Sequence, residues 1–159
     1  MLRWRRFDDH DPMTLHLRPA ADLDLRFARD LTRQAMLPYY ARHDLLWLDA
    51  GFDQAWHWRD NRMICRDMLP LGYVSLSRDA HALFIRELHL LPAHRGQGVG
   101  QWVLEQVARQ ARSERLPRIR LMVFKNNPAQ RLYSRHGFEV VGEQDSFLRM
   151  EHVLSGLGR

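Results

Sequence analysis

The chain has 159 residues, of which 45% are hydrophobic, and a formal net charge of +5. This length predicts one domain, and no apolar run is long enough to cross a bilayer. Cys65 is the only cysteine, which excludes an internal disulfide framework and suits the cytoplasm. No cluster of Cys and His has the spacing of a zinc site. Lys125 is the only lysine among the 24 basic residues, and the arginines are scattered rather than interleaved with aromatics, so no nucleic-acid partner is expected.

The first half of the chain predicts a strand, two helices and three further strands. The strand covers residues 14–20, and a helix follows over residues 21–42, which Pro38 is expected to kink or end early. An aromatic-rich helix covers residues 49–61. Strands over residues 62–66 and 71–77 are joined by a turn at 67–70, and a third strand over residues 82–91 is closed by Pro92.

The second half begins with the stretch HRGQGVGQW, residues 94–102, and continues as a helix whose valines at 99, 103 and 107 share one face. A strand covers residues 118–124. Asn127 and Pro128 can open a short helix that Gly137 ends, and two strands over residues 138–143 and 146–154 finish the chain. The order β-α-α-β-β-β-α-β-α-β-β predicts a mixed α/β fold with a mainly antiparallel sheet.

The glycine stretch lies between a strand and the start of a helix. A helix N-terminus offers unpaired N–H groups and a positive dipole end, and glycines let an anion approach these amides without meeting a Cβ. The sequence therefore predicts a phosphate cradle, with a tight turn or close packing as the plainer alternative. The spacing fits neither the dinucleotide fingerprint nor a Walker loop.

Two segments together resemble the GNAT N-acetyltransferases. Residues 95–100, RGQGVG, match the acetyl-CoA loop pattern [RQ]-x-x-G-x-[GA] of that family. Its second motif, N-x-x-A-x-x-L-Y-x-x-x-G-F, is matched at Asn126, Ala129, Leu132, Tyr133, Gly137 and Phe138. The resemblance spans roughly residues 71–153 and implies the GNAT acyl-CoA N-acyltransferase fold, as one domain over residues 14–159 after an extension of residues 1–13.

The resemblance also implies acetyl-CoA as co-substrate, without a metal. Its pyrophosphate would lie over the glycine loop, and its pantetheine arm would enter where the strand before the loop splays. The implied cofactor-binding residues are Leu90, Leu91, Arg95, Gly96, Gln97, Gly98, Val99, Gly100, Gln101, Asn126, Ala129 and Tyr133. For Ala129, plain helix packing is an almost equally good interpretation.

Tyr133 and Glu87 are the expected catalytic residues. By the resemblance, the Tyr133 hydroxyl lies near the CoA sulfur and can protonate the thiolate; the alternative is a core aromatic. Glu87 is the only acid in the strand before the loop and can deprotonate the amine, directly or through a water. It could instead be a surface charge or pair with Arg86. Leu90 or Leu91 would supply the N–H for the oxyanion, and the histidines at 89 and 94 are secondary candidates for the base.

The predicted function is direct acetyl transfer to a primary amine. A small cationic amine is favoured because Tyr39, Tyr40, Trp47, Phe52, Trp56 and Trp58, of which at least half should be core, lie among Asp44, Asp49 and Asp53. A protein N-terminus or lysine is the alternative acceptor, and a non-catalytic acyl-CoA-binding regulator is the alternative of another class. No membrane partner is expected, and a homodimer is left open.

Overall fold

The computed structural model describes residues 14–156, and the expected extension over residues 1–13 lies outside this range. The strands and helices follow the predicted order. Their bounds are β1 (Leu15–Pro19), α2 (Leu25–Arg42), α3 (Asp49–Trp58), β2 (Asp60–Arg66), β3 (Leu69–Arg78), β4 (Ala82–Leu90), α4 (Val99–Ser113), β5 (Arg118–Phe124), α5 (Gln130–Arg135), β6 (Glu139–Gln144) and β7 (Phe147–Val153), with short 3₁₀ turns η3 (Asp22–Asp24) and η4 (Pro92–His94).

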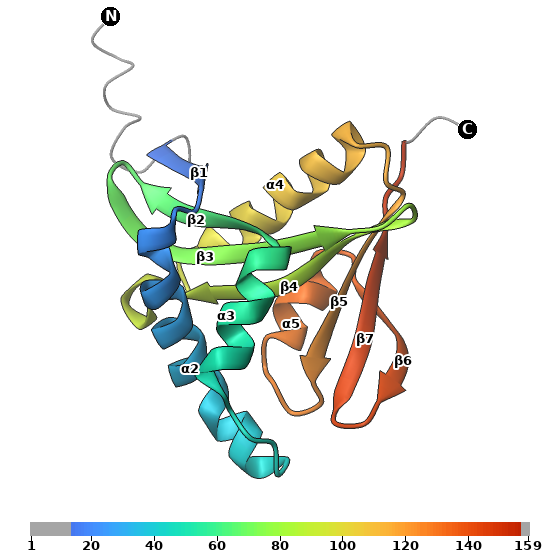
Figure 1. Ribbon diagram of the computed structural model, residues 1–159. Coiled ribbons are helices and arrows are strands. Elements are labelled where there is room, and N and C mark those ends of the chain that lie inside the picture. The colour runs from blue at the N-terminus through green and yellow to red at the C-terminus, as the bar shows by residue number, and fades with distance from the viewer. Residues whose placement is uncertain (1–13, 157–159) are drawn as a thin grey trace, which may run out of the picture.

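One seven-stranded sheet with the order β1-β2-β3-β4-β5-β7-β6 organises the fold (Figure 1). Every neighbouring pair is antiparallel except β4 and β5, which confirms the predicted mixed fold with a mainly antiparallel sheet. The parallel pairing joins only residues 82–85 of β4 to residues 118–121 of β5. Beyond that point the two strands separate, so the C-terminal half of β4 has a backbone edge that β5 does not cover. We call this opening the split.

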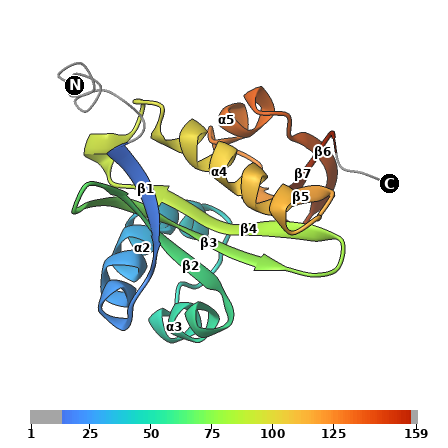
Figure 2. The same cartoon turned by 90° about the horizontal axis from the view of Figure 1, so that it is seen from above.

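Helices cover the two faces of the sheet unequally (Figure 2). On one face, α4 and α5 pack over the middle strands, and α4 buries Val99, Val103, Leu104, Val107 and Ala111 against them. On the other face, α2 and α3 lie over β1–β4 and enclose a second cluster that includes Ala28, Trp56 and Tyr73. Burying a valine or leucine side chain, such as those of α4, stabilises the fold by roughly 1.5–3 kcal/mol. On the second face of β5, β7 and β6, the end of α2 reaches Phe124, and no helix among residues 14–156 covers the rest of these strands.

Several predicted boundaries differ from the structure. The helix predicted from residue 21 begins at Leu25, after the turn η3, and it continues through Pro38 to its predicted end at Arg42. Pro38 and Gln34, whose carbonyl loses its helical donor, both lie on the exposed side, where water can take the lost partner's place. The turn between β2 and β3 is shorter than predicted, since Leu69 already belongs to β3 and Asp67 takes a φ of 55°. The aromatic-rich helix stops at Trp58, three residues early.

Candidate active site

The glycine loop lies directly between η4 and α4, at the end of β4. Gly96 and Gly98 have φ values of 72° and 85°, a region that glycine enters without the cost of a Cβ, and a Cβ built on either would meet no atom within 4 Å. These two glycines are therefore required by the left-handed backbone conformation of the loop, and the space next to them is open.

The amides of this loop form the anion-binding surface that the sequence predicts. Within the described part of the chain, the N–H groups of residues 96–101 donate to no protein acceptor, and the first bond of the helix runs from the Trp102 N–H to the Gly98 carbonyl. These unpaired amides surround the positive end of the α4 dipole. An anion such as a pyrophosphate fits here without displacing any protein contact.

Gly100 has a different reason to lack a side chain. A Cβ at this position would lie 3.1 Å from Cδ2 of Leu132 in α5, so the glycine allows α4 and α5 to approach closely. Gln97 and Gln101 direct their side chains back to the Ala93 carbonyl and to Glu105. Both side chains therefore leave the amides of the loop uncovered.

Leu90 and Leu91 differ in the direction of their N–H groups. The Leu91 N–H bonds the Leu71 carbonyl of β3 at 2.8 Å, so it is already engaged in the sheet. Because bonding directions alternate along a strand, the Leu90 N–H points the opposite way, into the split. The Leu90 carbonyl on that same side accepts a 2.9 Å hydrogen bond from Arg95 Nε. Of the two expected donors, Leu90 is the one that faces the split.

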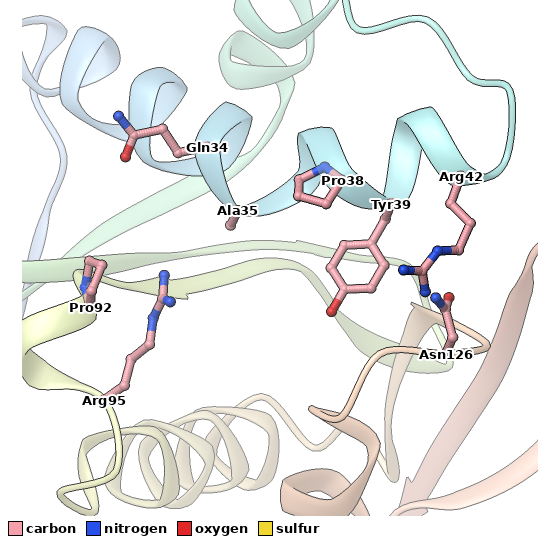
Figure 3. A pocket seen from close by; sticks show the side chains of 8 residues that line it. All are labelled: Gln34, Ala35, Pro38, Tyr39, Arg42, Pro92, Arg95 and Asn126. Atoms are coloured by element: carbon pink, nitrogen blue, oxygen red, sulfur yellow. The ribbon is translucent and has the colours of Figure 1, made fainter.

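A pocket of about 490 Å³ opens beside this loop (Figure 3). Arg95 lies at one end and Asn126, from the loop after β5, lies at the other, while one face of α2 forms the facing wall. The wall consists of Gln34, Ala35, Pro38, Tyr39 and Arg42. Apart from Tyr39, which was expected on the acceptor side, the sequence did not indicate these helix residues. Their shared signal is a spacing of three and four positions, which puts them on one face.

The second motif supplies the other side of the site. Asn127 rather than Asn126 caps the turn before α5, since its Oδ1 accepts the Ala129 N–H at 2.8 Å. Asn126 lines the pocket, and its Oδ1 lies 3.1 Å from Nε2 of His43, the residue that follows α2. Ala129 packs against the core cluster, which supports its interpretation as a packing residue.

Tyr133 is a core aromatic and also a candidate acid. Its ring contacts Phe138 edge-on at 5.7 Å, and 8% of the residue is exposed. Burial raises the pKa of the Tyr133 hydroxyl to about 12, with a smaller contribution from the negative charge of Glu87. The two expected catalytic groups, which are 46 positions apart in the chain, therefore lie close enough to interact.

Glu87 lies where β4 is irregular. The register passes from Ser75↔Glu87 to Leu76↔Ile85, so Arg86 is an extra residue that forms a bulge. The alternative interpretation, in which the Glu87 carboxylate pairs with Arg86, is wrong. It contacts His89 Nε2 at 2.7 Å and the Arg59 guanidinium at 3.7 Å, and its side chain is 23% exposed. His89 and Arg59 are partners that the sequence did not single out as such.

The aromatic segment behaves differently from its prediction. Of the six aromatics named, which all lie in the described range, only Trp56 belongs to the buried core, and Trp58 is 86% exposed. Tyr39 and His43 instead stack on Phe124, at centroid distances of 5.4 and 5.1 Å. The expectation that at least half would be core is wrong, because these rings bridge the end of α2 to the end of β5.

Two of the three aspartates expected to attract a cation are neutralised within the fold. Asp49 accepts hydrogen bonds from Arg33 and from the Trp47 indole, at 2.9 and 2.8 Å, and these partners lower its pKa. Asp53 pairs with Arg29 at 3.0 Å. These carboxylates hold α3 against α2, so they contribute little negative potential to an acceptor site.

Neither a metal site nor a membrane span is found among residues 14–156. No three His, Cys, Asp or Glu side chains of this range gather closely enough to hold an ion. None of its helices is both long and apolar enough to cross a bilayer. Cys65 is a buried free thiol in the cluster beneath α2.

Comparison with known proteins agrees with this geometry. The sequence model described as the acetyltransferase (GNAT) family matches residues 25–138, which include the glycine loop, Glu87 and Tyr133. Several solved structures share the fold. A PaiA N-acetyltransferase from Thermoplasma acidophilum, in complex with coenzyme A, superposes with a TM-score of 0.70 at 17% identity, covering 88% of this chain and 99% of its own.

Two further structures that share the fold differ in their acceptors. The ribosomal-protein-S18-alanine N-acetyltransferase from Escherichia coli has a TM-score of 0.70 at 16% identity, covering 91% of this chain and 96% of its own. The spermidine N-acetyltransferase from Vibrio cholerae, in complex with CoA and spermine, has a TM-score of 0.70 at 19% identity, covering 90% and 97%. At these identities the likeness extends to the fold.

Proposed function

The chain belongs to the GNAT acetyltransferase family and is an acetyl-CoA-dependent N-acetyltransferase, and from this premise we propose that it moves the acetyl group directly onto a primary amine at Glu87. The observation that carries the proposal is the meeting of three groups at the split. They are the unpaired amides of the glycine loop, the inward Leu90 N–H, and Glu87, whose charge acts on the buried Tyr133 hydroxyl.

The loop and the split divide the binding of acetyl-CoA, which supplies an activated acetyl thioester. The amides of residues 96–101 suit its pyrophosphate, because they offer several donors at the positive end of α4. Arg95 and Asn126 line the pocket on either side of the path into the split. Leu90 can donate its N–H to a carbonyl oxygen placed in the split, where negative charge develops during transfer.

Glu87 and Tyr133 handle the two protons. An alkylamine is protonated at neutral pH, so it must lose a proton before it attacks. The Glu87 carboxylate, held by His89 and Arg59, can take that proton directly or through a water. The Tyr133 hydroxyl can donate a hydrogen bond to the departing sulfur.

The acceptor is the less constrained part of the proposal. A small primary amine, cationic until it is deprotonated, would be drawn to Glu87, while Asp49 and Asp53 are already paired. The alternative acceptors are a protein N-terminus and a lysine side chain. Tyr40 of α2 is half-exposed, and burial together with the negative charge of nearby Glu87 raises its pKa. The C-terminal half of α2 therefore borders the acceptor side.

The test is release of the CoA thiol from acetyl-CoA over a panel of small amines and peptides. We expect amine-dependent release that Glu87→Gln lowers without weakening the binding of acetyl-CoA. Thiol release that no amine stimulates would contradict the proposal. An undiminished rate in the Glu87→Gln enzyme would move the base elsewhere.

A further inference from the structure

The sheet face beside Glu87 is left open by the helices. Strand alternation and the observed registers put Arg120 and Met122 of β5 and Arg149 of β7 on the face that α2 and α3 leave uncovered (Figures 1 and 2). Met122 is 42% exposed, and Val153 at the far end of β7 is 60% exposed. This face is continuous with the edge of the proposed acceptor site.

The bulge in β4 brings an arginine to the same face. Regular alternation would direct Arg86 and Glu87 to opposite faces. In the structure the Arg86 Nε instead donates to Ser77 Oγ at 2.7 Å, and its guanidinium lies 4.6 Å from the centre of the Phe84 ring. Arg120 approaches the same ring from β5 at 5.9 Å. Two guanidinium groups therefore flank Phe84, immediately next to the proposed base.

Positive charge is in excess on this face. Among the described residues, the arginines on and beside the face outnumber the carboxylates: they are Arg59, Arg86, Arg118, Arg120 and Arg149, against Glu87, Glu139, Glu151 and Asp79, whose charge acts on Arg86 and Arg120. Glu151 is shared by Arg118 at 3.5 Å and Arg120 at 2.7 Å. In the described chain no carboxylate forms an ion pair with Arg86. Burial and repulsion from Arg59 lower the Arg86 pKa, and the more weakly acting charge of Asp79 opposes them.

We propose that the acceptor is a polypeptide whose residues next to the acetylated amine are acidic, bound across β4, β5 and β7 by Arg86, Arg120 and Arg149. This inference rests on the proposed function and names its acceptor. Carboxylates of the acceptor supply the charge that the face lacks, and a guanidinium can bind a carboxylate with two parallel hydrogen bonds. An open face favours a polypeptide, because small molecules bind in concave pockets, and the pockets of about 490 and 470 Å³ are lined by other residues than these arginines.

The shape of the face is consistent with an extended chain. Arg86, Arg120 and Arg149 come from three strands that are neighbours in the sheet, so they form a row that leads away from Glu87. Phe84 and Met122 lie between them as apolar contacts. The amine at the end of such a chain would lie at Glu87, while its following residues meet the arginines in turn.

The experiment compares peptides that share one N-terminal residue and differ only in the next positions, as Asp-Glu, Asn-Gln or Lys-Arg. We expect kcat/KM to be at least about tenfold higher for the Asp-Glu peptide than for Asn-Gln, in line with a charge-assisted hydrogen bond. Arg86→Gln and Arg120→Gln should each reduce this preference, and Arg86→Glu should shift it toward Lys-Arg. The preference is read within each variant as the ratio of kcat/KM for the Asp-Glu and Asn-Gln peptides, so that a general effect of the substitution on Glu87 cancels.

Arg109→Gln is the matched control, because Arg109 is an exposed arginine of α4 beyond the opposite face. It should leave the preference unchanged, and thermal melting of each variant checks folding. Equal kcat/KM for the Asp-Glu and Asn-Gln peptides would overturn the inference, as would turnover of small amines alone. In either case acetyl transfer still occurs, whereas failure of the proposed function would appear as no transfer to any amine.

Discussion

Removing the Tyr133 hydroxyl tests the chemistry of the site most directly. A phenol of pKa about 12 next to a thiol of ordinary pKa, about 8.5, makes complete proton transfer to the thiolate uphill. The difference of roughly 3.5 pKa units corresponds to about 5 kcal/mol. The hydroxyl therefore acts mainly by a hydrogen bond that strengthens as charge develops on sulfur, and the proton moves late.

This reasoning sets the expected size of the effect. Loss of a hydrogen bond to a charged group costs about 1.5–3 kcal/mol, and general acid catalysis contributes about 10²–10⁴-fold. When the energy is converted to a rate ratio, the two ranges overlap near a hundredfold, so Tyr133→Phe should lower kcat by about 10². Its contact with Phe138 needs only the ring, so folding should be retained.

Steady-state thiol release and calorimetry with acetyl-CoA separate the two quantities. We expect kcat to fall while the Kd for acetyl-CoA stays nearly constant. Tyr73→Phe is the control, since the buried Tyr73 hydroxyl bonds Thr32 and should affect Tm more than kcat. Equal kcat in the Tyr133→Phe and wild-type enzymes would refute the reasoning and leave Tyr133 as a packing residue.

The remaining predictions concern the loop, the base and alkaline stability. Gly98→Val should weaken CoA binding strongly in calorimetry, because Gly98 has a φ of 85° and the side chain would cover the free amides; unchanged affinity would remove the loop from the site. Glu87→Gln should depress the rate most at low pH, where the amine is hardest to deprotonate, and an overlaid pH–rate profile would exclude it as base. Folding raises the pKa of Tyr133 from 10 to about 12, so the contribution of this hydroxyl to the free energy of unfolding is present below pH 10 and is lost as the pH rises toward 12. Denaturant unfolding should therefore show a decline in stability over that interval that is smaller in Tyr133→Phe.

Local signals explain why the fold was readable from the sequence. The valine face of α4 and the terminal Gly137 depend on neighbours within a few positions, and the structure shows both of them. Asn127 accepts a hydrogen bond within the turn before α5, and the helix itself begins later than predicted, at Gln130. The failures arose where distant contacts decide. Pro38 remains within α2 because its side of the helix is exposed, and Tyr39 stacks on Phe124, which follows 85 positions later.

The site divides in the same way. The motif sequence indicated the glycine loop and Tyr133, whereas the partners of Glu87 follow from the bulge at Arg86 and from where α3 ends. Neither feature has a local sequence signal. The pocket lined by Arg42 and Arg95 also exists only once α2 has packed over the end of β4.

The split has a consequence for hydrogen exchange along a single strand. The amides of Leu88 and Leu90 point into it, while those of His89 and Leu91 bond β3. In the free enzyme, adjacent amides of β4 should therefore alternate between rapid and slow deuterium uptake, a pattern unusual for an interior strand. Acetyl-CoA bound between β4 and β5 would slow deuterium uptake only at the amides that point into the split. Binding could therefore be followed at individual residues of β4.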